Sequence, residues 1–150
     1  MITAFKFHAQ PGLARFLADV MRSHPAIAKL THECDALIPV PLSAQRLRER
    51  GFNQALLLAK QLAPQRVVAT GLLRIRDTAV QSSLTRDARL HNLTHAFMVA
   101  PAHTAVLRQS RVVLLDDVMT TGASLRACTQ ALLVAGVARV DVVVLARTPL

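Results

Sequence analysis

Two adjacent carboxylates, Asp116 and Asp117, stand directly before a short segment rich in hydroxyl groups and small side chains. That segment consists of Val118, Met119, Thr120, Thr121, Gly122, Ala123 and Ser124. Its hydroxyl and backbone N–H groups can donate hydrogen bonds to an anion, and Gly122 lacks the Cβ that would keep an oxyanion away from the main chain. Because the carboxylates would repel a simple phosphate, the combination favours a ligand with a phosphate at one end and neighbouring hydroxyls at the other, such as a ribose 5-phosphate.

The flanking residues predict a strand, a loop and a helix around this group. Residues 112–115 are consecutive apolar residues bounded by polar ones, which is typical of a strand buried on both faces of a parallel sheet and predicts that the strand ends at Asp116. Residues 123–134 carry apolar side chains at helical spacing. The loop N–H groups and the helix N-terminus then favour a phosphate at this junction. In the alternative interpretation, the two carboxylates cap the helix and residues 120–122 only form a turn.

A second polar group follows an earlier predicted strand, residues 35–38. The strand runs into a rigid loop that consists of Pro39, Val40, Pro41 and Leu42. An apolar helix is predicted over residues 55–62. It is preceded by three arginines at alternate positions and by a polar pair: Arg46, Arg48, Arg50, Asn53 and Gln54. Cations beside such a loop indicate phosphate contacts. The alternative is a solvated, amphipathic surface turn in which Gly51 acts as a helix breaker.

Helical and strand patterns alternate along the rest of the chain. We expect a helix over residues 11–30 that is interrupted or ended near Pro25, strands over residues 67–75, 96–99 and 140–146, a connector over residues 101–110, and a helix stop at Gly136. The alternation predicts an α/β fold in one domain, residues 1–150. Such a fold has a parallel sheet with helices on both faces, and its ligand lies at the carboxyl ends of the strands.

A long polar run separates two of these strands, over residues 76–95. It contains Gln81, Arg86 and Arg89. Long polar segments without secondary structure are uncommon inside compact domains unless they serve function, so we predict a lid over the ligand. The alternative is a purely connecting loop.

The composition limits the classes of partner and compartment. The chain has 150 residues and a formal net charge of +9, and most of its 18 basic residues are arginine. Arginine suits phosphate recognition, so the excess indicates a polyanionic partner such as pyrophosphate or nucleic acid, although genome composition alone can produce it. Without Trp or Tyr, a stacking platform for single strands is not expected. Two cysteines make neither a disulfide framework nor a zinc site, and no apolar run approaches the roughly 20 residues of a membrane span, so we expect a cytoplasmic protein.

A set of motifs from about residue 6 to residue 147 resembles the ComF family, also described as GntX-like, of the type I phosphoribosyltransferase superfamily. The motifs are Pro39-Val-Pro-Leu, Arg50-Gly-Phe-Asn-Gln, Leu73-Arg-x-Arg-x-Thr, Gln81-x-x-Leu, Arg89-x-x-Asn, Ala96-Phe, Asp116-Asp117 with Thr120-Thr121-Gly122, and Ala146-Arg147. The resemblance implies the type I phosphoribosyltransferase fold, in which helices flank both faces of a parallel sheet and a flexible hood loop covers the site.

The resemblance also implies a ligand, phosphoribosyl pyrophosphate (PRPP), and a role for each part of the site. Asp116 and Asp117 would hold the ribose 2′- and 3′-hydroxyls as the catalytic acids and would bind Mg²⁺ indirectly, while residues 118–124 would wrap the 5-phosphate. Contacts to pyrophosphate and in the lid would come from Pro39, Val40, Pro41, Leu42, Arg46, Arg50, Asn53, Gln54, Gln81 and Arg89.

In biological terms, the resemblance implies a role in DNA uptake and utilisation during natural competence. Phosphoribosyltransferase activity is left open, because no motif identifies an acceptor and a fold alone does not define a reaction. The alternative is a non-catalytic module that binds single-stranded DNA or a DNA helicase. In that module the DNA phosphates would be contacted by Arg46, Arg48, Arg50, Arg74, Arg76, Arg86 and Arg89. Family members commonly begin with a cysteine-rich zinc element, which we expect this chain to lack. The sequence predicts no oligomeric state.

Overall fold

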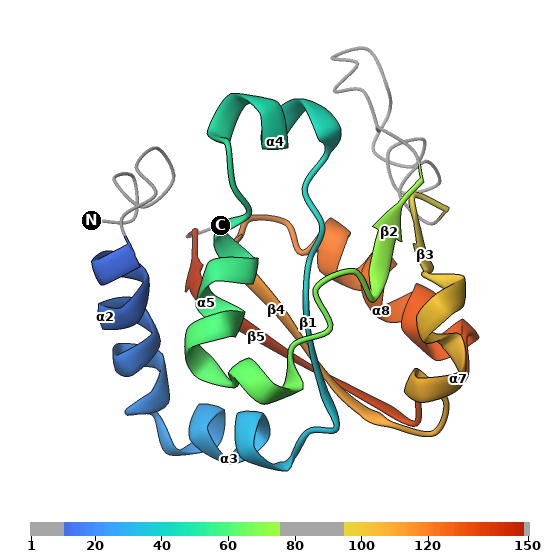
Figure 1. The fold of residues 1–150 in the computed structure, drawn as a ribbon, viewed down its shortest axis with the longest axis horizontal. Helices are drawn as coiled ribbons and strands as arrows, with labels where there is room; N and C mark the ends of the chain where they lie inside the picture. Colours follow the sequence, from blue (N-terminus) through green and yellow to red (C-terminus); the bar gives the residue numbers. More distant parts are fainter. Residues whose placement is uncertain (1–10, 76–94, 149–150) are drawn as a thin grey trace.

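The computed structural model describes residues 11–75 and 95–148, and a three-stranded parallel sheet lies at its centre (Figure 1). The strand order is β1-β4-β5, with β1 at Ala36–Pro39, β4 at Arg111–Met119 and β5 at Arg139–Arg147. In the register, Ala36 pairs with Val112, and Asp116 pairs with Val144. The predicted α/β fold with a parallel sheet is confirmed.

Three helices cover one face of this sheet: α2 (Pro11–Arg22), α3 (Pro25–Glu33) and α5 (Gln54–Leu62). The predicted break near Pro25 is present, because α2 ends at Arg22 and a new helix begins with that proline. Leu17 and Leu58 from the helices pack with Leu37 and Val113 from the strands in one buried cluster. This layer fixes β1 and β4 side by side, so their carboxyl ends lie together.

The opposite face is covered by α8 (Ala123–Val134), whose bounds agree with the predicted helix. Leu125, Cys128 and Leu132 of α8 are buried against Val112 and Leu114 of β4. The helix ends just before Gly136, which has a φ of 92° and fits the predicted helix stop. Because α8 follows β4 directly, its N-terminus is held at the carboxyl edge of the sheet.

The predicted end of the central strand at Asp116 is wrong. β4 continues to Met119, because β5 pairs with it as far as Arg147. The sequence shows only where the apolar run ends. The end of β4 itself depends on how far β5 continues to form backbone hydrogen bonds with it. The two carboxylates therefore project from the last residues of a strand rather than from a loop.

The strand predicted over residues 67–75 is also shorter than expected. Only β2 (Leu72–Arg74) forms there, and it pairs in antiparallel fashion with β3 (Phe97–Val99) in a separate two-stranded sheet. A short 3-10 helix, η1 (Pro64–Arg66), precedes it. At Gly71 the chain passes so close to β1 that an added Cβ would lie 3.1 Å from the Ile38 side chain. This crossing interrupts the apolar run before β2.

Two other predicted boundaries change. The connector over residues 101–110 contains a 3-10 helix, η2 (Pro101–His103), and a helical turn, α7 (Thr104–Leu107). Pro39 is the last residue of β1 rather than the first residue of the following loop. It is tolerated because β1 has only an isolated bridge, to Val67, on its other side within the described residues.

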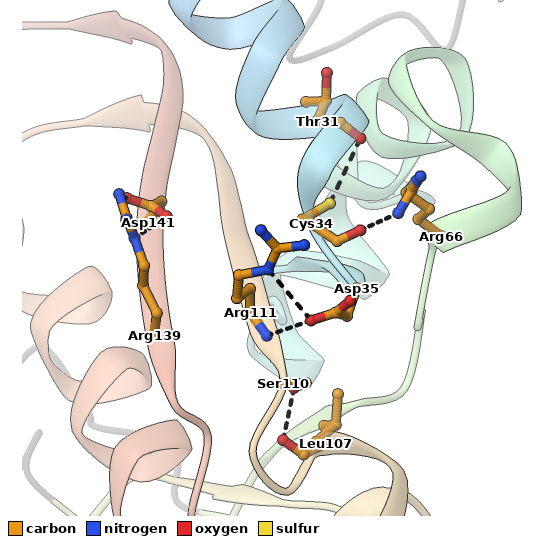
Figure 2. A network of polar contacts seen from close by, with 9 residues as sticks. All are labelled: Thr31, Cys34, Asp35, Arg66, Leu107, Ser110, Arg111, Arg139 and Asp141. Atoms are coloured by element: carbon orange, nitrogen blue, oxygen red, sulfur yellow. Dashed lines mark hydrogen bonds and ion pairs between the residues drawn. The ribbon is translucent and has the colours of Figure 1, made fainter.

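The amino ends of the strands are joined by a network of polar contacts (Figure 2). The backbone N–H of Arg111 donates to Asp35 Oδ2 at 2.7 Å, and Arg111 Nε lies 3.7 Å from the same oxygen. On β5, Arg139 donates to both carboxylate oxygens of Asp141, at 2.8 and 2.9 Å. The Asp35 contacts connect the start of β4 with the residue before β1, whereas the Arg139–Asp141 pair lies within β5.

Across residues 11–75 and 95–148, no helix combines the length and apolar character needed to cross a membrane.

Candidate functional site

A cavity of about 200 Å³ lies at the carboxyl ends of β1 and β4. It is lined by Val40, Pro41, Leu42, Arg46, Arg50, Arg74, Asp116, Asp117, Val118, Met119, Thr120, Thr121, Gly122, Ala123, Ser124 and Leu125. The volume is below the roughly 300–1,000 Å³ of drug-sized pockets, so a small polar ligand fits best. The fold therefore brings together both of the polar groups that the sequence singles out.

The two carboxylates form the acidic side of the cavity. Asp116 Oδ1 accepts from the Asp117 N–H at 2.8 Å, and Asp117 Oδ1 accepts from the Val118 N–H at 2.8 Å. Asp117 is only 9% exposed, and its Oδ2 is buried without a hydrogen-bond donor in the described part of the chain. A buried carboxylate oxygen left in this state is costly unless a ligand or cation satisfies it.

Burial and the neighbouring carboxylate change the acidity of Asp116. The pKa of Asp116 is raised to about 7, first because burial disfavours the charged form and second because Asp117 is close. Arg46 opposes this shift by attracting the negative charge. A cation that binds between the carboxylates would favour their ionised forms, so ligand binding and proton release are expected to be coupled.

The interpretation that these carboxylates cap the following helix is wrong. The N-cap of α8 is Gly122, with a φ of 74°, and no side chain makes a capping hydrogen bond there. The carboxylates instead accept from backbone N–H groups within β4. Both residues also line the cavity, which a purely structural cap would not require.

The loop between β4 and α8 is ordered by its own contacts. The Ala123 N–H donates to Thr121 Oγ1 at 3.3 Å, and Arg126 Nη1 donates to the Thr121 carbonyl at 3.1 Å. A Cβ at Gly122 would lie 3.4 Å from both Met119 Sδ and Arg126 Nη1, in a backbone conformation that side chains rarely adopt. The first N–H groups of a helix have no partner within the helix, so α8 presents donors to an anion held by this loop.

Two of the arginines that line the cavity come from a short helix, α4 (Ala44–Arg50). The Ser43 side chain caps its start, and Gly51, with a φ of 77°, ends it. In a helix, residues four apart share a face, so Arg46 and Arg50 both line the cavity whereas Arg48 does not. The alternate spacing of the three arginines therefore does not make them one phosphate-binding row.

Asn53 and Gln54 lie behind the cavity lining rather than in it. Asn53 accepts from the Leu56 N–H at 3.3 Å, which caps α5, and its amide donates to the Val40 carbonyl at 3.0 Å. Gln54 is fully buried and accepts from Arg50 Nη1 at 3.2 Å. Both residues therefore position the residues predicted to meet pyrophosphate. Pro39 is likewise buried in β1 and is not among the lining residues.

Two lining residues were not part of the predicted phosphoribosyl site, Arg74 and Leu125. Arg74 lies over the Phe97 ring, with its Cζ 5.3 Å from the centroid, and the β2–β3 pair holds it there. The sequence analysis includes Arg74 in a family motif and in a row of arginines for nucleic acid, but gives it no role in the phosphoribosyl site. The predicted residues Gln81 and Arg89, and likewise Arg76 and Arg86, lie outside the described residues.

The site has a limited set of metal ligands. Within the described ranges, no group of three or more His, Cys, Asp or Glu side chains could hold a metal ion. The chemistry of the Asp116–Asp117 pair, with its unsatisfied buried oxygen, nevertheless fits a hard cation. Mg²⁺ typically takes one or two carboxylates and completes its shell with water and ligand phosphates.

Comparison with known proteins gives the class to which this fold belongs. Residues 50–149 match the family described as "Phosphoribosyl transferase domain". Two solved structures share the fold over 96% of this chain and 30% of theirs: the "allosteric regulatory enzyme of purine biosynthesis" (16% identity, TM-score 0.58) and the "glutamine phosphoribosylpyrophosphate (PRPP) amidotransferase" of Bacillus subtilis (17% identity, TM-score 0.57).

Proteins of similar sequence identify a family within this class. "Competence protein F" of Haemophilus influenzae is 36% identical over 98% of this chain, "DNA utilization protein YhgH" of Salmonella typhimurium is 32% identical over 99%, and "Competence protein ComFC" of Bacillus subtilis is 37% identical over 67%. The chain spans 66% of the first two proteins and 39% of the third. The chain belongs to the ComF family of the type I phosphoribosyltransferase superfamily.

Proposed function

We propose that this chain binds PRPP, with Mg²⁺, at the carboxyl ends of β1 and β4. The single observation that carries the proposal is the juxtaposition, in one small cavity, of a helix N-terminus, a buried pair of carboxylates and two arginines from α4. Each of the three matches a different part of the ligand: a 5-phosphate, vicinal ribose hydroxyls and a diphosphate at C1.

The order of these groups gives the ligand one orientation. The 5-phosphate lies in the loop of residues 120–124, where N–H groups and hydroxyls donate. Asp116 and Asp117 accept from the ribose hydroxyls, which satisfies the buried Oδ2 of Asp117. Arg46 and Arg50 then face the C1 diphosphate from the other side of the cavity.

The same arrangement suits departure of diphosphate from C1. Negative charge grows on the leaving group while the sugar becomes oxocarbenium-like, so cations at the diphosphate and carboxylates beneath the ribose both stabilise that change. Bound Mg²⁺ would supply further positive charge to the diphosphate. Whether an acceptor then takes the ribosyl group separates a transferase from a binding module.

The biological role we propose is DNA uptake or utilisation, in the cytoplasm. Support comes from the names of the relatives, which are competence and DNA utilization proteins. Both cysteines, Cys34 and Cys128, are buried and free, as is usual for proteins of a reducing compartment.

Direct binding of single-stranded DNA is the second candidate, because Arg48 is exposed on α4 and the net charge is +9. Such binding needs cations along a phosphate track but no buried carboxylates. The acidic side of the cavity therefore favours PRPP as the ligand of this site, and leaves the outer face of α4 as the surface for DNA.

Calorimetric titration with PRPP tests the proposal. We expect 1:1 binding that strengthens when Mg²⁺ is added, and competition by ribose 5-phosphate and by pyrophosphate separately, since each occupies half of the cavity. A single-stranded oligonucleotide should not displace PRPP. The proposal fails if PRPP with Mg²⁺ gives no saturable binding, or if the oligonucleotide competes for the same site.

A further inference from the structure

Arg50 interacts with an uncharged amide, that of Gln54, and with a carboxylate, that of Asp117. Its Nη1 donates to Gln54 Oε1 at 3.2 Å and lies 4.0 Å from Asp117 Oδ2. The second distance is too long for a hydrogen bond, so Arg50 compensates the charge of Asp117 without satisfying its oxygen. The guanidinium is therefore bonded to an uncharged amide and only electrostatically attracted to the carboxylate.

Gln54 is suited to hold this position. Its side chain is 0% exposed, and it stands at the first residue of α5, whose start is fixed by the Asn53 cap. A buried amide that accepts from a guanidinium stabilises one orientation of a long side chain that would otherwise sample many. The Arg50 side chain is itself only 19% exposed, so its charge acts in a partly desolvated setting.

We propose that Arg50 is an exchangeable counter-ion, positioned by Gln54. Without ligand, Arg50 compensates Asp117. When a divalent cation or the ribose hydroxyls occupy Asp117, the charge of Arg50 serves the diphosphate instead. Gln54 is a positioning residue that keeps the guanidinium within reach of both. This inference rests on the proposed function, because it assigns the diphosphate to the α4 side of the cavity.

The substitution Arg50→Gln should change the affinities for a divalent cation and for pyrophosphate in opposite directions. Arg50→Gln removes the positive charge but keeps an amide that can still donate to Gln54. A divalent cation should then bind more tightly, because a like charge near Asp117 is gone, whereas pyrophosphate should bind more weakly. A residue with a merely structural role would weaken both, since a disturbed cavity harms every ligand.

Two separate titrations test this on the intact chain. Mn²⁺, used alone in place of Mg²⁺ and followed by water-proton relaxation, should bind Arg50→Gln about threefold to tenfold more tightly than wild type. Inorganic pyrophosphate alone, followed by calorimetry, should bind about tenfold more weakly. Arg48→Gln removes the same charge from the same helix but not from the cavity lining, so it should change both affinities by less than about twofold.

The role of Gln54 is tested by a double-mutant cycle. Gln54→Met keeps the side-chain volume and removes the acceptor, so pyrophosphate affinity should fall several-fold in the wild-type background and not at all in the Arg50→Gln background. Independent effects of the two substitutions would overturn the positioning role. If Gln54→Met does not fold, the Arg50→Gln and Arg48→Gln titrations still decide the counter-ion role.

The outcomes also separate this inference from the proposed function. Opposite changes in Mn²⁺ and pyrophosphate affinity, in a chain that does not bind PRPP, would retain the counter-ion role and reject the PRPP proposal. PRPP binding accompanied by parallel losses of Mn²⁺ and pyrophosphate affinity in Arg50→Gln would retain the PRPP proposal and overturn the counter-ion role.

Discussion

The two ends of the parallel sheet carry similar side chains in opposite states. At the amino end, Asp35 accepts from the Arg111 N–H, and Arg139 binds both oxygens of Asp141 at an exposed position (Figure 2). At the carboxyl end, Asp116 and Asp117 are adjacent, largely buried and incompletely satisfied. At the amino end the aspartates accept hydrogen bonds, whereas at the carboxyl end Arg50 lies 4.0 Å from an Asp117 oxygen that has no hydrogen-bond donor in the described part of the chain.

The difference supports the proposal that the carboxyl end binds a ligand, whereas the contacts at the amino end are satisfied within the fold. A carboxylate paired in solvent contributes modestly and needs nothing further. A buried carboxylate with an unpaired oxygen costs stability, and that cost persists only where something else, such as a ligand, compensates for it. Substitutions that neutralise these groups at each end test the difference between the two ends.

The largest expected effect is a pH dependence of stability at the carboxyl end. The folded-state pKa of Asp116 is raised to about 7 from an ordinary value of 3.8, so the folded state holds the proton more tightly than the unfolded state. Stability should therefore be fully present below pH 4 and fall as the pH rises to about 7, by about 1.4 kcal/mol for each unit between the two pKa values. Asp116→Asn should remove this decline.

Denaturant unfolding of both proteins from pH 4 to pH 8 gives the measurement. The difference between wild type and Asp116→Asn isolates the contribution of Asp116 from that of the other titrating groups. Parallel stability profiles for the two proteins would show that Asp116 titrates normally and would remove the electrostatic difference between the two ends of the sheet.

The second effect concerns ligand binding. Asp116→Asn combined with Asp117→Asn should weaken PRPP–Mg²⁺ binding by at least about tenfold, because the hydroxyl acceptors and the ionic partner of the metal are lost. The melting temperature should not fall, since two repelling buried charges are removed. Calorimetry and thermal unfolding measure the two quantities. A large fall in melting temperature with unchanged affinity would assign the pair to the fold instead.

The third prediction uses a matched pair of glycines at the two ends of α8. Gly122 and Gly136 have φ values of 74° and 92°, so alanine at either position should cost about 1 kcal/mol of stability. Only Gly122→Ala should also weaken PRPP binding, because its Cβ enters the lining of the cavity. Equal losses of affinity in both variants would mean that the helix, rather than the loop, governs binding.

The smallest effect is expected at the amino end. Asp35→Asn keeps an oxygen that can accept from the Arg111 N–H but loses the charge, so thermal unfolding should show a loss of at most about 0.5–1 kcal/mol. PRPP affinity should stay at its wild-type value. A change in affinity comparable to that of the Asp116 and Asp117 variants would show that the two ends of the sheet are coupled.

Neighbouring residues are sufficient to predict several helices and strands of this protein. Helical spacing over residues 123–134 and the glycine after it predicted α8 with its observed bounds. The apolar run at 112–115 identified the central strand. The acidic pair and the Thr-Thr-Gly segment beside it predict a phosphoribosyl ligand, which stays a prediction. These features are local, because a helix period, a buried strand and a glycine-dependent turn are each fixed by neighbouring residues.

Which side chains meet depends on contacts between segments that are distant in the chain. Pairing with β5 carried β4 on to Met119, and an antiparallel pair with β3 brought Arg74 to the cavity. The helical form of α4 turned Arg48 away from the cavity that Arg46 lines. Sequence spacing cannot supply these facts, because strand ends and side-chain partners depend on segments far apart in the chain that come together only when the sheet and its helices pack.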